Sequence, residues 1–208
     1  GYTVLRNLIT GGFAGVVYPV NPKSESVQGI QAYPNVASLP HPPDLAVICT
    51  PAEAVPGIVG ELGEIGTRAA VVISAGFGEG GDAHGLALKE AMQAAAGPHL
   101  LRVVGPNCLG VMVPRIGLNA TFAHLTPRRG SIAFVAQSGA IVTSVLDWAQ
   151  ARGIGFSHLV SLGDMADVDL GDMLDYLASD GSTTAVLLYV ESVTQARKFM
   201  SAARAAAR

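Results

Sequence analysis

The sequence predicts an α/β fold built on parallel β-sheets, and three observations carry that prediction. Of the 208 residues, 50% are hydrophobic, whereas only 14% are charged and 6% are aromatic. Glycine is abundant, with 25 residues. Short aliphatic runs alternate with longer helix-like stretches, which is the pattern of βαβ units with right-handed crossovers. Strands buried on both faces of a parallel sheet are expected to be this aliphatic.

Each strand predicted in the first half is a short aliphatic run bounded by Gly, Pro or polar residues. These runs are Val16–Val20, Asp44–Cys49, Ala69–Ile73 and Leu101–Val104. The helices predicted before and between them span Thr3–Gly11, Ala52–Ile65 and Ala83–Ala96. Because a helix comes before the first of these strands, we expect the strand that should precede that helix to be missing from this chain.

From Ser131 the alternation begins again. The predicted strands are Ser131–Ala136, Phe156–Ser161 and Thr184–Val190, and the predicted helices are Ser138–Arg152, Asp169–Ala178 and Thr194–Arg208. The segment before them contains Pro114, Pro127 and Gly130, which favours a domain boundary near Pro127. We therefore expect two domains, residues 1–126 and 127–208, the second incomplete at its C-terminal end.

The composition excludes several classes of protein. Disordered chains are poor in apolar residues and rich in charge, and two Cys are too few for a disulfide scaffold. The aliphatic runs are far shorter than the roughly 20 residues that a membrane-spanning helix needs. The net charge is −3 and no basic run extends beyond Arg128–Arg129, so we expect no nucleic-acid partner. The His and Cys spacings fit no zinc site, and Cys49 and Cys108, both expected to be reduced, favour a cytoplasmic protein.

Ligands of open parallel sheets bind at the carboxyl ends of the strands, so the residues just after each strand are the candidate site. They are rich in Gly, Ser, Asn and Pro: Asn21-Pro22-Lys23, Thr50-Pro51, Ser74-Ala75-Gly76-Phe77-Gly78, Gly105-Pro106-Asn107-Cys108, Gln137-Ser138-Gly139-Ala140 and Ser161-Leu162-Gly163-Asp164. Any one of these loops could be explained by ordinary turn chemistry. Their recurrence after six strands favours a ligand cradle.

The loop after Val16–Val20, which is the second strand of the fold when the missing first strand is counted, indicates which ligand binds. A nicotinamide-dinucleotide site normally places Asp or Glu there to bind the ribose hydroxyls. This loop offers Lys23 and no carboxylate, which favours a phosphate on the ribose, as in NADP or coenzyme A. The alternative is that Lys23 is an ordinary solvated lysine.

A second candidate site opens the helix predicted after Ala136. The free N–H groups at a helix start and the positive end of the helix dipole bind anions, so Gln137-Ser138-Gly139-Ala140 predicts a phosphate or carboxylate site. The alternative role of Ser138 is an N-cap. Glu191 ends the last aliphatic strand and would point into the same crevice, or it is simply a hydrophilic strand end.

Several segments together resemble the nucleoside-diphosphate-forming acyl-CoA synthetases, relatives of the succinyl-CoA synthetase α subunit. They are Val17-Tyr18-Pro19-Val20-Asn21-Pro22-Lys23, Val72-Ile73-Ser74-Ala75-Gly76-Phe77, Gly105-Pro106-Asn107-Cys108-Leu109-Gly110, Gly117-Leu118-Asn119-Ala120-Thr121-Phe122, Ala136-Gln137-Ser138-Gly139-Ala140, Gly153-Ile154-Gly155-Phe156-Ser157 and Ser161-Leu162-Gly163-Asp164 with Ala166-Asp167-Val168-Asp169. The resemblance covers essentially the whole chain in order.

The resemblance implies a Rossmann-like CoA-binding domain followed by a flavodoxin-like ligase domain. It places Asn21 and Lys23 by the adenosine phosphate end of CoA. The nucleotide and pantetheine parts of CoA would be lined by Thr50, Pro51, Ser74, Ala75, Gly76 and Phe77. The thiol end of CoA would lie near Pro106, Asn107 and Cys108. The resemblance also implies that Gln137, Ser138, Gly139 and Ala140 hold phosphate and that Glu191 orients a phosphorylated histidine.

The sequence departs from the family in two places. The glycine-rich first loop would lie at or before Gly1, and none of the five His has the Ser-His-Thr-Gly-like context of the phosphohistidine. We therefore expect that histidine to lie outside this chain. In the implied reaction, acyl-CoA and phosphate give acyl phosphate and CoA, and the histidine carries the phosphoryl group to ADP or GDP. An ATP-grasp domain or subunit would bind that nucleotide with Mg²⁺, and we expect the intact enzyme to be an oligomer.

Two other functions fit the same loops. A non-catalytic CoA or acyl-CoA sensor fused to a GNAT-type lysine acyltransferase would need a similar cradle. An NADP oxidoreductase is the third hypothesis, although no plausible catalytic pair lies between the two halves.

Overall fold

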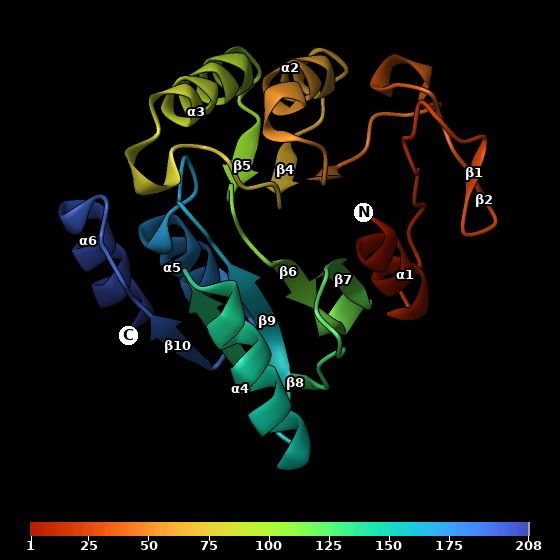
Figure 1. The fold of residues 1–208 in the computed structure, drawn as a ribbon. Helices are drawn as coiled ribbons and strands as arrows, with labels where there is room; N and C mark the ends of the chain where they lie inside the picture. The colour runs from red at the N-terminus through yellow and green to blue at the C-terminus, as the bar shows by residue number, and fades with distance from the viewer. Residues whose placement is uncertain (208) are drawn as a thin grey trace.

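Figure 1 shows the computed structural model of the chain, which describes residues 1–207. The strands form three sheets. They are a two-stranded hairpin of β1 and β2, a three-stranded sheet in the order β3-β4-β5, and a five-stranded sheet in the order β10-β8-β9-β6-β7. No helix within residues 1–207 is long and apolar enough to cross a membrane.

The three-stranded sheet is parallel. We call this sheet and the helices that join its strands the first unit, and the five-stranded sheet and its helices the second unit. The strands of the three-stranded sheet are β3 (Leu45–Ile48), β4 (Ala69–Val72) and β5 (Arg102–Val104), joined by α2 (Val55–Glu64) and α3 (Ala83–Ala96). The two helices lie side by side over the sheet (Figure 1). Val59 of α2 and Met92 of α3 are fully buried against Val72 of β4, because both helices present an apolar face to the strands.

Helix α1 (Tyr2–Thr10) begins at the ends of β3 and β4 but packs against the second sheet (Figure 1). The side-chain amide of Asn7, itself buried, donates to the carbonyl oxygens of Thr121 (2.9 Å) and Ala123 (2.7 Å). The chain then passes through the small hairpin of β1 (Ser26–Val27) and β2 (Ile30–Gln31) before it enters β3.

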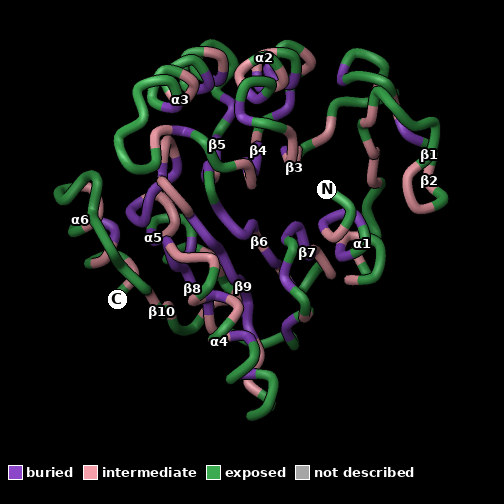
Figure 2. The backbone as a smooth tube through the Cα atoms, viewed as in Figure 1, coloured by how far each residue is buried: buried purple, intermediate pink, exposed green. Residues whose placement is uncertain are grey.

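The five-stranded sheet is mixed. Its strands β8 (Arg129–Ala136), β9 (Phe156–Ser161) and β10 (Ala185–Tyr189) are parallel, and the hairpin of β6 (Gly110–Val113) and β7 (Leu118–Thr121) joins β9 antiparallel. Helix α4 (Gly139–Ala151) covers one face, and α5 (Leu170–Ser179) and α6 (Ala196–Ala206) cover the other. Figure 2 shows the consequence: β9 is buried along its length, whereas β10 at the sheet's edge is largely exposed.

The predicted α/β class is confirmed, with a parallel first sheet and a mixed second sheet. The helix predicted at Ala83–Ala96 coincides with α3. The strand predicted at Val16–Val20 is wrong, because only Val20 pairs, through a single bridge to Tyr33. The residue before it, Pro19, has no N–H to donate to a sheet, although its carbonyl accepts from the Tyr33 N–H (2.9 Å).

The sequence pattern predicts no strand at β6 or β7, and it assigns β7 to the connection between the halves. The five-stranded sheet includes the hairpin of these two strands, so hydrogen-bonded pairing extends across the boundary predicted near Pro127. The division at residue 127 stays a prediction about the two domains. The choice of β9 as a partner depends on tertiary contact, which a local pattern does not reveal.

The segment that follows β9, residues 162–168, lies along β5 and joins the two units. The Val168 N–H donates to the carbonyl oxygen of Val103 (3.0 Å), and the Asp164 N–H donates to that of Pro106 (3.0 Å). A segment of the second unit is therefore hydrogen-bonded to β5 and to the loop that follows it.

The segment starts with a glycine that the packing requires. Gly163 has a φ of +56°, and a Cβ there would lie 2.1 Å from the carbonyl oxygen of Pro106, so any side chain is excluded. Near its other end, Arg102 Nε lies 2.9 Å from Asp167 Oδ2. These contacts fix the carboxyl edge of the second sheet against the loop that follows β5.

Candidate functional site

A cleft of about 570 Å³ lies at the carboxyl edge of the three-stranded sheet. The residues that line it are Gly1, Tyr2, Thr3, Val4, Cys49, Thr50, Pro51, Ile73, Ser74, Ala75 and Phe122. Four of the predicted site residues, Thr50, Pro51, Ser74 and Ala75, are among them. The first turn of α1 and Phe122 were not predicted to line it. The available signal for Phe122 was its place in the segment Gly117–Phe122, which resembles the acyl-CoA synthetases.

One residue that lines the cleft, Thr50, carries a hydroxyl with no partner among the described residues. Thr50 Oγ1 is buried and makes no hydrogen bond there, whereas the Ser74 hydroxyl donates to the carbonyl oxygen of Thr50. A buried polar atom without a hydrogen bond is destabilising and is most often satisfied by a ligand or water. A polar group bound beside Thr50 is therefore a candidate partner for this hydroxyl.

Two predicted residues of the loop after β4 support the cleft and are not among the residues that line it. The N–H groups of Gly76 (2.9 Å) and Phe77 (2.8 Å) donate to the carboxylate of Glu79. The Phe77 ring is buried in the core under α2 and α3. The carboxylate of Glu79 holds this loop in a closed turn, and the residues of the loop that line the cleft are Ile73, Ser74 and Ala75.

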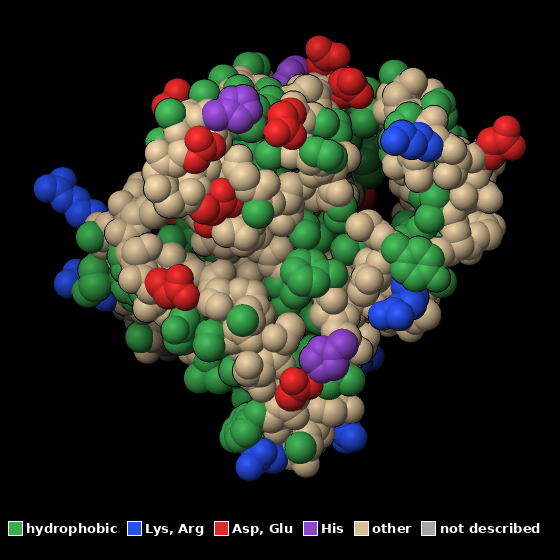
Figure 3. Space-filling model, in the orientation of Figure 1, with side chains coloured by type: hydrophobic (Ala, Val, Ile, Leu, Met, Phe, Trp, Pro, Cys, Tyr) green, Lys and Arg blue, Asp and Glu red, His purple; other side chains and the backbone are tan. Residues whose placement is uncertain are grey.

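The predicted residues Asn21 and Lys23 are also absent from the cleft lining. Asn21 shapes its own turn, because its side-chain oxygen accepts from the Lys23 N–H (2.9 Å) and its N–H donates to the carbonyl oxygen of Tyr33 (2.8 Å). Lys23 is exposed. Lysines and arginines are few on the face of the molecule shown in Figure 3, most of which is uncharged.

The loop after β5 contacts the carboxyl edges of both sheets. The Asn107 N–H donates to the carbonyl oxygen of Ser74 (2.9 Å), and the Leu109 N–H donates to Ser161 Oγ at the end of β9 (3.0 Å). The side-chain amide of Asn107 also donates to Asp164 (3.3 Å), and burial raises the pKa of that carboxyl. Loop 105–109 therefore connects the two candidate sites.

The two thiols differ in their surroundings. Cys108 is buried, its Sγ lies 3.3 Å from the carbonyl oxygen of Val72, and burial raises its pKa to about 12. Burial also raises the pKa of Cys49 in the cleft, although the nearby amino terminus of Gly1 opposes it. Cys108 is consequently a neutral packing residue, because thiol reactivity requires the thiolate.

The start of α4 carries the predicted anion site. Ser138 is its N-cap, with Oγ accepting from the Ile141 N–H (3.4 Å), and a Cβ on Gly139 would meet Leu109 Cβ at 3.0 Å. The side chains of Gln137 and Ser138 are thus engaged within the protein. Main-chain N–H groups of Gly139 and Ala140, with the positive end of the helix, are what remains for an anion.

Glu191 follows β10 and is exposed, and the side chain of Gln137 lies against its backbone. Gln137 Oε1 accepts from the Glu191 N–H at 2.6 Å. Gln137 in turn follows β8, whose last residue Ala136 pairs with Tyr189 of β10. The sheet therefore brings Glu191 beside the start of α4, as predicted for a carboxylate at this end of the strand.

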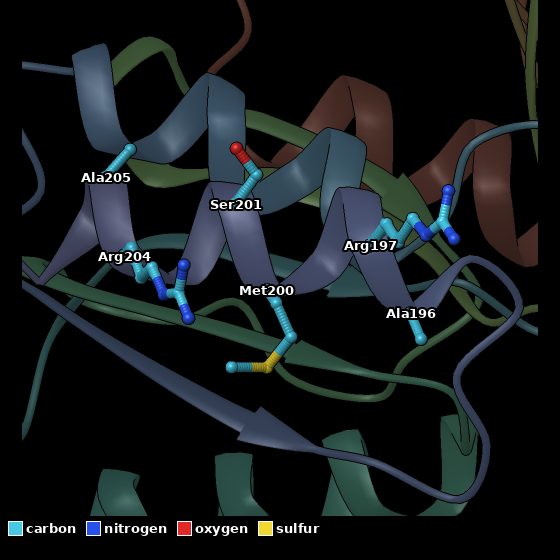
Figure 4. Close-up of a pocket in the computed structure, with 6 residues that line it drawn as sticks. All are labelled: Ala196, Arg197, Met200, Ser201, Arg204 and Ala205. Carbon is cyan, nitrogen blue, oxygen red and sulfur yellow. The ribbon is translucent and has the colours of Figure 1, made fainter.

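A second hollow, of about 590 Å³, runs along α6 and is lined by Ala196, Arg197, Met200, Ser201, Arg204 and Ala205. Figure 4 shows these side chains along a single helix, with no other element contributing to the lining. The described residues also hold no group of three or more His, Cys, Asp or Glu that could bind a metal ion. The convergent polar groups lie at the sheet edges instead.

Comparison with known proteins identifies both halves. Residues 1–114 match the family described as CoA binding domain, and residues 129–208 match the succinyl-CoA ligase like flavodoxin domain. The ADP-forming acetate–CoA ligase I of Archaeoglobus fulgidus is 45% identical over 208 residues, which cover 100% of this chain and 30% of that protein.

Two solved structures are similar over nearly the whole chain. A crystal structure of a Pyrococcus horikoshii protein has a TM-score of 0.94 and 39% identity, covering 99% of this chain and 47% of that one. The dinucleotide forming acetyl-coenzyme A synthetase 1 of Candidatus Korarchaeum cryptofilum, in complex with phosphate and ADP, has a TM-score of 0.91 and 36% identity, covering 98% of this chain and 44% of that one.

The chain thus spans less than half the length of each of these relatives. The resemblance seen in the sequence is confirmed over both halves. The chain belongs to the CoA binding domain family, and its second half adds the flavodoxin domain of succinyl-CoA ligase-like proteins, in the order found in NDP-forming acyl-CoA synthetases.

Proposed function

We propose that this chain is the CoA-binding part of an NDP-forming acyl-CoA synthetase, an acid–thiol ligase. The full enzyme would convert acyl-CoA, phosphate and ADP or GDP into the acid, CoA and ATP or GTP. One observation carries the proposal. Loop 105–109 bonds to Ser74 beside the cleft and to Ser161 beside the α4 anion site, so one ligand and one anion would meet at a shared loop.

Coenzyme A would occupy the cleft of the first unit. The unpaired Thr50 hydroxyl and the start of α1 favour a polar, phosphate-bearing ligand there, and the apolar wall of Ile73 and Phe122 suits its adenine or pantetheine. CoA supplies the thiol that carries the acyl group. Asn21 and Lys23 would lie toward its ribose phosphate, and Pro106, Asn107 and Cys108 toward its thiol end.

Phosphate would bind at the start of α4. There the N–H groups of Gly139 and Ala140 and the helix dipole stabilise negative charge on the phosphoryl oxygens without reorganising. Glu191 would orient a phosphorylated histidine that lies outside this chain. Mg²⁺ and ADP or GDP would be bound by an ATP-grasp domain or subunit, also outside it. We expect the assembled protein to be an oligomer and to work in the cytoplasm.

The first experiment compares CoA with NADP as ligands of this chain. CoA is expected to raise the thermal unfolding temperature and to give a saturable heat in isothermal titration, because a ligand that binds only the folded state stabilises it. NADP is the matched control, since it also carries a ribose phosphate. Stabilisation by NADP alone would overturn the CoA assignment.

The second experiment tests the anion site with inorganic phosphate. Titration followed by amide NMR is expected to shift the resonances of Gly139 and Ala140, and sodium chloride at equal ionic strength is the control. Shifts spread over the surface, with none at these two amides, would contradict a phosphate site at α4.

A further inference from the structure

We propose that Gln137 is a positioning residue that fixes Glu191 beside the start of α4, and that its side chain does not bind phosphate. The inference rests on the proposed function, because it is there that Glu191 orients the phosphorylated histidine. It corrects the expectation that Gln137 is itself a phosphate ligand.

The side-chain amide of Gln137 is bonded to one short segment. Its Oε1 accepts from the N–H groups of Glu191 (2.6 Å) and Ser192 (2.9 Å), and its Nε2 donates to Ser192 Oγ (3.0 Å). The acceptor oxygen is used twice, and all three bonds run toward the segment that carries Glu191. A side chain engaged in this way is fixed on the segment of Glu191 and is not free to reorient toward an anion at the helix start.

Gln137 is itself held in place by both neighbouring strands. Its carbonyl oxygen accepts from the Gly163 N–H (3.1 Å) and from Ser161 Oγ (3.5 Å), and its N–H donates to the carbonyl oxygen of Tyr189 (3.4 Å). It is only 7% exposed. A buried amide with this many partners cannot turn elsewhere without leaving polar groups unsatisfied.

Glu191 depends on this support because it lies outside regular structure. β10 ends at Tyr189 and α6 begins at Ala196, so no ladder fixes the backbone between them. Besides Gln137, the side-chain bond that holds this segment within residues 1–207 runs from Thr194 Oγ1 to Asp169 (3.0 Å), at its far end. The position of the Glu191 backbone is consequently set by one side chain.

The chemistry of the site explains why this side chain is an amide. A glutamine oxygen accepts from two N–H groups as a carboxylate would, but it adds no negative charge next to Glu191 and the phosphate site. A glutamate at residue 137 would keep the acceptor, lose the donor to Ser192 and repel phosphate.

The test is a double-mutant cycle in the full enzyme that carries this chain, with Gln137→Met and Glu191→Gln alone and combined. We expect Glu191→Gln to lower kcat by roughly 100-fold and Gln137→Met by roughly 10-fold, with KM for phosphate within about 2-fold. Because Gln137 acts through Glu191, the double variant should match Glu191→Gln within about 2-fold.

Gln137→Glu is the conservative variant and guards against misfolding of Gln137→Met. It should retain more kcat than Gln137→Met, since it still accepts from both N–H groups, and it should raise KM for phosphate. In this chain alone, Gln137→Met should shift the amide resonances of Glu191 and Ser192 more than those of Gly139 and Ala140.

The two proposals fail in different ways. A normal kcat in Glu191→Gln overturns the role of Glu191 and the inference with it. A loss of kcat in Glu191→Gln, together with a normal kcat in Gln137→Met or with additive losses in the double variant, overturns the inference alone. A KM for phosphate raised about 10-fold by Gln137→Met, with unchanged kcat, would make Gln137 a phosphate ligand.

Discussion

The cleft of the first unit and the start of α4 are two candidate sites built in opposite ways. In the cleft, Thr50 carries a buried hydroxyl with no partner among the described residues. At α4, the side chains of Gln137 and Ser138 are bonded within the protein, and the main-chain N–H groups of the first turn are what the proposed anion site would offer. If both proposals hold, the first site would give its ligand a side chain that has no partner among the described residues, whereas the second would use side chains to hold the backbone that binds.

This difference predicts opposite responses to substitution. Removing an unpaired polar atom should stabilise the free chain and weaken binding, because that atom gains a partner only from the ligand. Removing a bonded side chain at α4 should lose stability and placement together. The contact that joins the sites, through Gly163 and loop 105–109, should affect both.

The largest effect is expected from Gly163→Ala. A Cβ at this position would lie 2.1 Å from the carbonyl oxygen of Pro106, and the φ of +56° disfavours a side chain, so the segment after β9 must shift. We expect a loss of about 3 kcal/mol or more in the free energy of unfolding by urea. Binding of CoA and of phosphate should weaken together.

Gly181→Ala is the matched control, because a Cβ there has open space around it. It should change the free energy of unfolding by less than about 0.5 kcal/mol. If Gly163→Ala weakens CoA binding and leaves phosphate binding intact, the two sites are not joined through this contact.

A smaller effect is expected from Thr50→Val. This substitution should raise the stability of the free chain and lower its affinity for CoA. The isosteric change removes a buried hydroxyl that has no partner within residues 1–207, so the free chain should gain about 1 kcal/mol, while CoA binds roughly 5- to 10-fold more weakly. Thr67→Val is the control: its hydroxyl is equally buried and unpartnered among the described residues, but Thr67 does not line the cleft. It should stabilise the chain without changing affinity, and equal losses of affinity in both variants would contradict the role of Thr50.

The smallest effect is expected from His158 of β9, which lies away from both candidate sites and should affect how stability depends on pH. Burial, with a smaller contribution from Arg115, lowers the pKa of His158 below its ordinary 6.5, although Asp180, 3.6 Å from Nδ1, opposes the shift. Tyr176 Oη lies 3.5 Å from its other ring nitrogen. The unfolded chain therefore takes up a proton at a higher pH than the folded chain does, so stability falls as pH drops from 6.5 toward the lower folded pKa.

The free energy of unfolding should change with pH by well below about 1.4 kcal/mol per pH unit, which is the limit for one proton. His158→Gln should flatten this dependence between pH 7 and 5 in urea unfolding. CoA and phosphate affinities at each pH should be the same in the variant as in the unchanged chain. A pH-dependent difference in either affinity would place His158 in contact with a site.

Local pattern was enough to predict most elements. The run of Ala83–Ala96 predicted α3 to the residue, because its helical content and its flanking Asp82 cap are both local. The segment Phe156–Ser161 likewise predicted β9 with the same bounds. Val16–Val20 failed because an extended run becomes a strand only where a neighbour pairs with it.

The candidate sites were predictable by position but not by role. That loops after strands bind ligands follows from the topology, and this placed Thr50, Ser74, Gly139 and Glu191 correctly at the sheet edges. Which atoms face the ligand depended on long-range hydrogen bonds. Gln137 turns to residues 191 and 192, far along the chain, and the Gly76 and Phe77 amides turn to Glu79.

By itself, the sequence determined the α/β class, the order of the helices and the loops that collect at the sheet edges, because these depend on periodicity and turn chemistry within a few residues. The tertiary structure alone decided that the hairpin of β6 and β7 joins the second sheet, and that α1 and Phe122 complete the cleft. It also decided that Gln137 supports Glu191. These choices rest on contacts between distant parts of the chain, where burial and hydrogen-bond satisfaction select one partner among many.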